Sequence, residues 1–245
     1  MIFRDIVFDA RYLVDREDSI RLLECELVQC AGFCVSDLYL RFLPKVVTPS
    51  TAKVIVAASG RAPIEPEETR IERLIEVLRF PWRFPFDDVI GRDEAAKKRA
   101  ILDALHEALV WLAKREGWSL SPFETAYRGC LDCGIVNAFF WKDGKAWASP
   151  NRRHKARIFY RFGPWTAETY AVIYDKADRE VGWSMLTQVM ASDAIIAELL
   201  GSCEWKSDEK FVVHPRRASP GKKNRWLCSL KYLQEPPFPG RIRLT

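Results

Sequence analysis

The spacing of apolar residues changes twice along this chain of 245 residues. Over residues 1–60, apolar and polar side chains alternate, as they do in the half-buried strands of an antiparallel sheet. Residues 61–118 change to spacings of three and four, which are typical of amphipathic helices, and alternation returns from residue 139. This order predicts an α+β fold in which two to four helices pack on antiparallel sheets. We expect a single domain over residues 1–245, with a division near residues 90–130 as the alternative.

Caps and helix breakers define the expected elements of the N-terminal half. Alternation predicts strands over residues 2–8, 23–28, 39–47 and 53–58. Pro66, followed by two acidic residues, is typical of a helix start, and Pro81 ends that helix. The segment 80–86, FPWRFPF, is too rich in proline for regular structure. A longer helix begins near Asp93 and ends at Gly117, with apolar residues at helical spacing between them.

Strand patterns return in the C-terminal half. Asp143-Gly144 tolerates the positive φ angles of a tight turn, which predicts a hairpin over residues 139–147. A short helix is expected over residues 193–200. The remaining strands are expected over residues 155–162, 170–174, 180–186, 211–214 and 226–233, with a second hairpin turning across 175–179.

Positive charge is concentrated at the C-terminal end of the chain. Residues 211–245 contain eight Lys or Arg residues and a single acidic residue, Glu235, and carry a net charge of +7. Residues 1–210 contain 30 basic and 32 acidic side chains and carry −2. Because summed charge attracts partners of opposite sign, this pattern predicts an acidic partner, either protein or nucleic acid.

Several classes of protein are disfavoured by the sequence. Arg4 and Asp5 precede any apolar run, so we expect no secretory signal, and the longest uncharged stretch, 181–192, is too short to span a bilayer. We therefore expect a cytoplasmic location and no membrane partner. The seven cysteines are interpreted as small buried residues in a reducing compartment. Cys130 and Cys133 have zinc-ligand spacing but lack a second pair, so no metal or other cofactor is expected.

Motifs for catalysis are weak in this chain, and a non-catalytic protein is favoured. No glycine-rich loop that could hold a phosphate is present. Asp175 together with Glu204-Trp-Lys206 resembles a nuclease arrangement only loosely, and we interpret these residues as members of surface ion pairs. His154 and His214 lie in basic runs, which disfavour the protonated form. They remain candidates for the general base if the chain is a metal-independent endoribonuclease.

Two basic segments, 151–161 and 214–226, carry the candidate binding residues. Cations beside aromatic rings can hold carboxylates or phosphates, and Trp and Arg dominate protein interfaces. The second segment, with two prolines and a glycine, predicts an extended loop, for which a merely solubilising role is the alternative. The candidates are Arg152, Arg153, Lys155, Arg157, Arg161, Arg216, Arg217, Lys222, Lys223, Arg225 and Trp226, with Trp82 and Trp165 as exposed anchors.

The segment 97–130, KKRAILDALHEALVWLAKREGWSLSPFETAYRGC, resembles part of bacterial immunity proteins that accompany polymorphic toxins. The shared elements are the long helix, its Gly117-Trp118 stop and the helical turn over residues 123–127. The resemblance implies a small α+β protein that occludes the active site of a cognate toxin. We therefore expect a non-catalytic bacterial immunity protein that neutralises a toxin with an acidic surface. The alternative is an RNA-binding or RNA-processing protein, such as a ferredoxin-like component of a CRISPR-type ribonucleoprotein.

Overall fold

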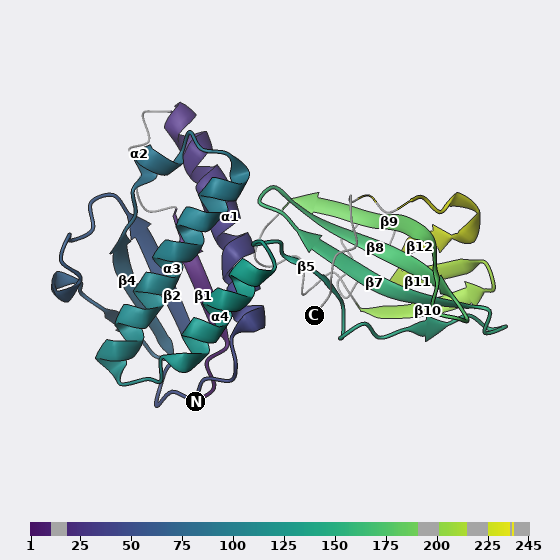
Figure 1. Ribbon diagram of the computed structural model, residues 1–245, viewed down its shortest axis with the longest axis horizontal. Coiled ribbons are helices and arrows are strands. Elements are labelled where there is room, and N and C mark those ends of the chain that lie inside the picture. Colours follow the sequence, from purple (N-terminus) through teal and green to yellow (C-terminus); the bar gives the residue numbers. More distant parts are fainter. Residues whose placement is uncertain (11–18, 191–200, 215–224, 236, 238–245) are drawn as a thin grey trace. The chain divides into compact units, whose positions relative to one another are not determined.

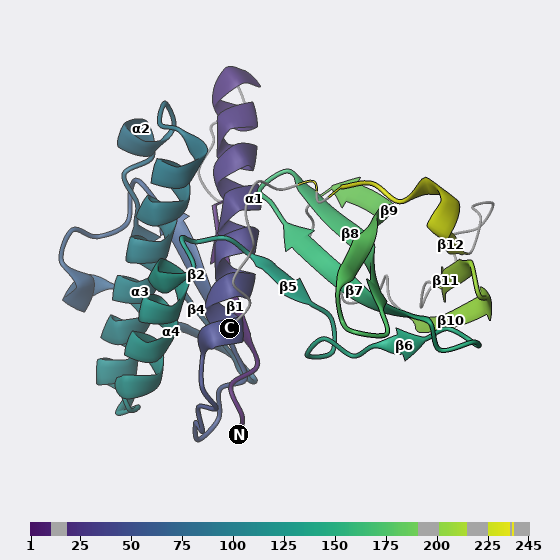
Figure 2. The same cartoon turned by 45° about the vertical axis from the view of Figure 1, so that its right-hand side comes forward.

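The computed structural model describes residues 1–10, 19–190, 201–214, 225–235 and 237 (Figure 1). The chain divides into two compact units, Met1–Asn137 and Ala138–Thr245, which we call the N-terminal and the C-terminal unit. All four α-helices of the described residues belong to the N-terminal unit, whereas strands dominate the C-terminal unit (Figures 1 and 2). The α+β class predicted from the sequence is confirmed. Within the described ranges, no helix is long and apolar enough to cross a bilayer.

The N-terminal unit contains a mostly parallel sheet. Its elements are β1 (Asp5–Asp9), α1 (Ser19–Phe42), β2 (Lys53–Ser59), the 3-10 helix η2 (Pro66–Glu68), β3 (Glu72–Leu74), β4 (Val77–Arg83), α2 (Phe86–Val89), α3 (Glu94–Glu116) and α4 (Ser121–Asp132). The strand order is β1-β2-β4-β3, and only β3 is antiparallel to its neighbour. The antiparallel sheet expected here is therefore wrong. Because parallel strands need a long crossover, the chain between β1 and β2 has room for the helix α1.

The helix α1 replaces the strand predicted over residues 23–28 and the first four residues of the strand predicted over residues 39–47. Val28, Ala31 and Val35 are buried, and their spacing of three and four is that of one helical face. The alternation over residues 23–28 spans too few residues to distinguish the repeat of two residues in a strand from the repeat of about 3.6 residues in a helix. The prediction was wrong because burial against the sheet, a tertiary effect, decides the period in such a short window.

A β-hairpin, β3–β4, replaces the helix predicted between Pro66 and Pro81. A helix over these residues would bury Leu74 and Ile75 on its apolar face, but they are 59% and 99% exposed. Pairing of β4 with the neighbouring strand β2 overrides the local helical pattern. The segment 80–86, expected to be irregular, lies partly in β4, and Pro81 is tolerated there because β3 covers β4 only as far as Arg79.

The helix α3 confirms the long helix expected from Asp93 to Gly117. Asp93 caps its N-terminus by accepting a hydrogen bond from the backbone N–H of Ala96 at 2.8 Å, and Gly117 ends it with a left-handed φ of 70°. The helical turn expected over residues 123–127 is part of α4. The buried face of α3 joins α1, α4 and the sheet in one hydrophobic core. Cys130 lies in that core, where burial raises the pKa of its thiol to about 12, as expected for a structural cysteine.

The C-terminal unit consists of two antiparallel sheets that share a hydrophobic core. Its elements are β5 (Ala138–Phe140), β6 (Trp147–Ala148), β7 (His154–Phe162), β8 (Thr166–Asp175), β9 (Glu180–Met190), β10 (Ser202–Ser207), β11 (Lys210–His214), β12 (Trp226–Ser229) and the 3-10 helix η3 (Leu230–Tyr232). One sheet has the order β5-β7-β8-β9, with β6 also on β7, and the other has the order β10-β11-β12. Ile158 and Ile173 of the first sheet pack with Phe211 and Cys228 of the second.

Most strands predicted in this half are confirmed. The expected strand 155–162 is β7, the hairpin across 175–179 joins β8 and β9, and β11 lies at the predicted position. The strand predicted over residues 226–233 is shorter, because β12 ends at Ser229 and the next three residues form η3. The hairpin predicted over residues 139–147 is wrong, because β5 and β6 each pair with β7 and not with one another. The helix predicted over residues 193–200 lies outside the described residues.

Candidate binding surface of the C-terminal unit

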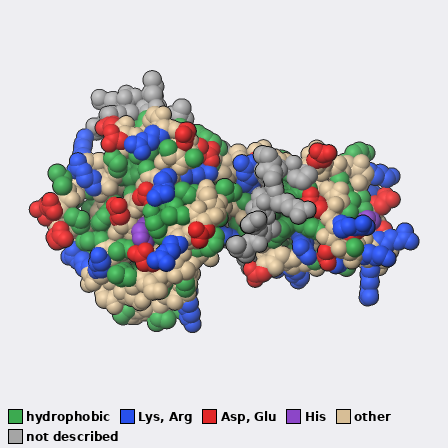
Figure 3. Space-filling view, viewed as in Figure 1, with side chains coloured by type: hydrophobic (Ala, Val, Ile, Leu, Met, Phe, Trp, Pro, Cys, Tyr) green, Lys and Arg blue, Asp and Glu red, His purple; other side chains and the backbone are tan. Residues whose placement is uncertain are grey.

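The two structural units differ in the sign of their charge. Residues 138–245 contain 19 basic and 11 acidic side chains, a net charge of +8. Residues 1–137 contain 19 basic and 22 acidic side chains, a net charge of −3. Figure 3 shows several Lys and Arg side chains gathered at one end of the C-terminal unit. The charge asymmetry seen in the sequence therefore coincides with a division of the fold, and it directs the search for a site to the second unit.

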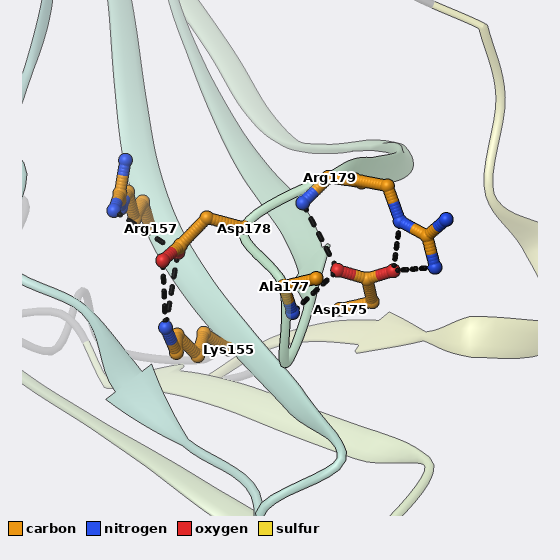
Figure 4. Close-up of polar contacts among 6 residues, drawn as sticks. All are labelled: Lys155, Arg157, Asp175, Ala177, Asp178 and Arg179. Carbon is orange, nitrogen blue, oxygen red and sulfur yellow. Dashed lines mark hydrogen bonds and ion pairs between the residues drawn. The ribbon is translucent and has the colours of Figure 1, made fainter.

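Part of the first basic segment is neutralised within the unit. Lys155 and Arg157 lie on β7 and point toward Asp178 in the β8–β9 turn (Figure 4). Lys155 Nζ is 2.9 Å from Asp178 Oδ2, and Arg157 Nη2 is 3.5 Å from Asp178 Oδ1. The Arg157 guanidinium also lies over the ring of Tyr174, 4.7 Å from its centroid. Arg161 is 3.8 Å from Glu168 on β8, so three of the five predicted cations of this segment face carboxylates of their own sheet.

The other two cations, Arg152 and Arg153, are exposed in the turn before β7. Asn151 holds this turn, because its side-chain oxygen accepts hydrogen bonds from the Arg153 backbone N–H at 2.9 Å and from the Ser149 hydroxyl at 2.8 Å. The backbone N–H of Asn151 donates to Asp208 in the β10–β11 turn at 2.8 Å. These contacts fix the turn that presents the two guanidinium-bearing residues to solvent.

The nuclease-like pattern resolves into ion pairs, as expected. Asp175 accepts hydrogen bonds from the backbone N–H groups of Ala177 and Arg179, and its other oxygen pairs with the Arg179 side chain at 2.7 Å (Figure 4). These hydrogen bonds hold the pKa of Asp175 below its usual value. Glu204 pairs with Lys206 at 2.6 Å, and hydrogen bonds from Lys206 and His214 lower the pKa of Glu204. Among the described residues, no three His, Cys, Asp or Glu side chains form a cluster that could hold a metal ion.

The two candidate histidines lie in different surroundings. His214 Nε2 is 2.9 Å from Glu204 Oε1, a carboxylate partner that the sequence did not predict. His154 begins β7, opposite Asp175 in the register, and its buried Nδ1 makes no hydrogen bond with any part of the chain that the structure describes.

The predicted tryptophan anchors differ in exposure. Trp165 is 47% exposed in the turn between β7 and β8. Trp226 is half-buried at the start of β12, next to the exposed Arg225. Trp82 is half-buried in the N-terminal unit, where it packs against Phe80 and Trp111. The remaining candidates, Arg216, Arg217, Lys222 and Lys223, lie outside the described residues.

A second group of cations and rings, in the loop between β5 and β6, was missed as a candidate. Trp141 and Trp147 stack with their centroids 5.8 Å apart and their planes 15° apart. Lys142 Nζ lies 4.3 Å from the Trp141 centroid, and Lys145 Nζ lies 5.5 Å from the Trp147 centroid. The sequence signal is one Trp and one Lys on each side of Asp143-Gly144, which was interpreted only as a turn.

Comparison with known proteins adds no functional residue to this surface. No protein-family description, curated protein sequence or solved structure matched the chain. Residues 97–130, for which the sequence suggested a resemblance to immunity proteins, comprise most of α3, its glycine cap and most of α4. The functional argument therefore depends on the charges and contacts of the C-terminal unit.

Proposed function

We propose that this chain is a non-catalytic binding protein whose C-terminal unit attaches to an acidic surface of a partner protein. The observation that carries the proposal is the division of charge between the units, −3 against +8, combined with exposed cations in the turns of the positive unit. Opposite charge on the partner would steer association and select against cationic proteins. Half-buried and exposed tryptophans in the same unit supply apolar area for the centre of such an interface.

Two contacts favour a protein over RNA as the partner. The Trp141 ring is contacted by both Trp147 and Lys142, so a base could stack on it only by displacing one of them. A carboxylate, in contrast, could pair with the lysines in their present positions. Lys155 and Arg157 already form ion pairs with a carboxylate of this chain, that of Asp178.

The cellular role that we propose is immunity toward a toxin, because residues 97–130 resemble bacterial immunity proteins. In this role the chain would occlude the toxin's active site and would need no catalytic residue of its own. Association would be fast and sensitive to salt, since electrostatic steering acts over about 10 Å at moderate ionic strength.

The test is co-expression of this chain with the product of each reading frame adjacent to its gene. We expect one product to arrest growth alone, and to be harmless and to co-purify when this chain is present. Substitution of Arg152 and Arg153 by Glu should weaken the complex and restore growth arrest. The matched control reverses two exposed lysines of the N-terminal unit, Lys45 and Lys114, which changes the net charge equally and should leave protection intact.

Two outcomes would contradict the proposal. If the control variant abolishes protection as completely as the Arg152 and Arg153 variant, total charge and not the C-terminal surface determines binding. If the chain instead co-purifies with nucleic acid and protects against neither neighbour, the RNA-binding alternative replaces the proposal.

A further inference from the structure

The loop between β5 and β6 leaves the sheet and is not needed for strand pairing. Phe140 pairs with Phe159 and Trp147 pairs with Ala156, so the six residues 141–146 occupy the place of two residues on β7. The backbone N–H of Trp141 still donates to the carbonyl oxygen of Ile158 at 2.8 Å, which fixes the point where the loop begins. We call residues 141–147 the Trp-Lys loop.

The Trp-Lys loop holds an unfavourable backbone conformation. Lys142, Asp143 and Gly144 have consecutive φ angles of 50°, 52° and 75°. Left-handed conformation is natural for Gly144 and accessible to Asp143, but it is unfavourable for Lys142. The loop is closed by a hydrogen bond from the Lys145 backbone N–H to the Lys142 carbonyl oxygen at 3.0 Å. Strain of this kind persists only where surrounding contacts impose it, and it is frequent at binding sites.

Contacts with β10 anchor the C-terminal end of the loop. The indole N–H of Trp205 donates to the carbonyl oxygen of Trp147 at 2.8 Å. Cys203 lies two residues earlier on the same strand. Burial raises the pKa of its thiol to about 12, and the positive charges of the nearby Lys142 and Lys145 oppose that rise. The loop is thus held at both ends, by β7 and by β10.

The Trp-Lys loop presents two lysine side chains to solvent, each lying over an indole ring. Lys142 and Lys145 are exposed, whereas Trp141 and Trp147 are half-buried, so the aliphatic stems of the lysines cross partly exposed indole surface. A partner carboxylate that pairs with a lysine would find apolar surface beside it. The loop carries a single acid, the exposed Asp143.

We propose that the Trp-Lys loop is the element that recognises an acidic peptide segment of the partner, by pairing Lys142 and Lys145 with carboxylates and placing apolar side chains beside the partly exposed indoles of Trp141 and Trp147. This inference depends on the proposed function, because it specifies where the C-terminal unit contacts its acidic partner. Both cations already lie over the indole rings, which lowers the side-chain entropy that is lost when the complex forms.

The experiment measures binding of a fluorescein-labelled peptide rich in Glu and Leu to the full chain by fluorescence anisotropy at low salt. Substitution of both Lys142 and Lys145 by Ala should weaken binding about tenfold, which corresponds to about 1.4 kcal/mol. Substitution of both by Arg should retain binding, because guanidinium groups keep the charge and the contact with the rings. The matched control replaces Lys176 in the β8–β9 turn and Lys210 at the start of β11, both exposed, by Ala and should change affinity less than twofold.

A second readout separates recognition from folding. Peptide binding should change the tryptophan emission of the wild-type chain and of the arginine variant, since the loop contains two indoles, and the change should be lost in the alanine variant. Equal urea midpoints for all variants would show that the loss is not caused by unfolding.

The possible outcomes distinguish the inference from the proposed function. If the alanine variant and the control bind the peptide equally well, the Trp-Lys loop is not the recognition element, although the C-terminal unit still binds acidic partners. If the wild-type chain does not bind the peptide, the proposed function fails together with the inference. If oligouridine binds more tightly than the peptide and competes for the same lysines, the loop recognises nucleic acid and the inference is overturned.

Discussion

Substitution of Asp178 by Asn should weaken the fold and strengthen partner binding. The side chain of Asp178 is 52% exposed and pairs with Lys155 at 2.9 Å and with Arg157 at 3.5 Å (Figure 4). Asn is the suitable replacement because residue 178 has a φ of 58°, a left-handed conformation that Asn adopts as readily as Asp. The substitution therefore removes one negative charge without a backbone penalty.

The magnitudes follow from the two ion pairs. Exposed pairs contribute about 0.2–1 kcal/mol each, so the free energy of unfolding should fall by about 0.5–2 kcal/mol. The net charge of the C-terminal unit rises from +8 to +9, and Lys155 and Arg157 become available to external carboxylates. Affinity for a Glu-rich peptide at low salt should therefore rise about two- to threefold.

Urea unfolding and fluorescence anisotropy measure the two effects on the same sample. Asp132→Asn is the control, because it removes one exposed carboxylate from the N-terminal unit and should leave affinity for the peptide unchanged. An Asp178→Asn variant that binds the peptide no better than wild type would show that Lys155 and Arg157 take no part in the binding surface.

Two further predictions concern the N-terminal unit. Gly129→Ala should destabilise the fold by about 1–3 kcal/mol despite the higher helix propensity of Ala, because an added Cβ would lie 2.6 Å from ring atoms of Phe42. Gly91→Ala is the control, because an added Cβ there would have no atom within 4 Å, and it should be nearly neutral in the same urea unfolding assay. Burial lowers the pKa of His106 below its ordinary value of 6.5, and Glu124 opposes this shift only in part. The neutral imidazole is therefore favoured in the fold, and its contribution to stability should be lost as pH falls below 6.5. His106→Gln should reduce the loss of unfolding free energy between about pH 7 and pH 5, and an unchanged loss would contradict the assignment.

Local sequence signals were sufficient to predict an element where the residues at its own ends determine where it begins and ends. The helix α3 was predicted because Asp93 and Gly117 mark its ends and its apolar spacing continues over many turns. The β8–β9 hairpin was predicted because a polar turn separates two apolar strands. In both cases the deciding interactions connect residues that are close in sequence.

The errors arise where a distant segment decides the structure. The local pattern of residues 66–81 is helical, but β2 provides a parallel strand with which residues 77–83 pair. The Trp-Lys loop looked like a hairpin because the sequence does not show that its two flanking strands share β7 as a partner. For the same reason, the neutralisation of Lys155 by Asp178 depends on the register between β7 and β8, which no local pattern specifies.

The most direct test of the account is the salt dependence of affinity for the Glu-rich peptide, measured for three forms of the chain. We predict that wild type loses affinity steeply as salt rises, that reversal of Arg152 and Arg153 reduces this dependence, and that reversal of Lys45 and Lys114 preserves it. An affinity that does not change with salt, or equal losses from both reversals, would contradict the claim that the C-terminal unit binds an acidic partner through its own cations.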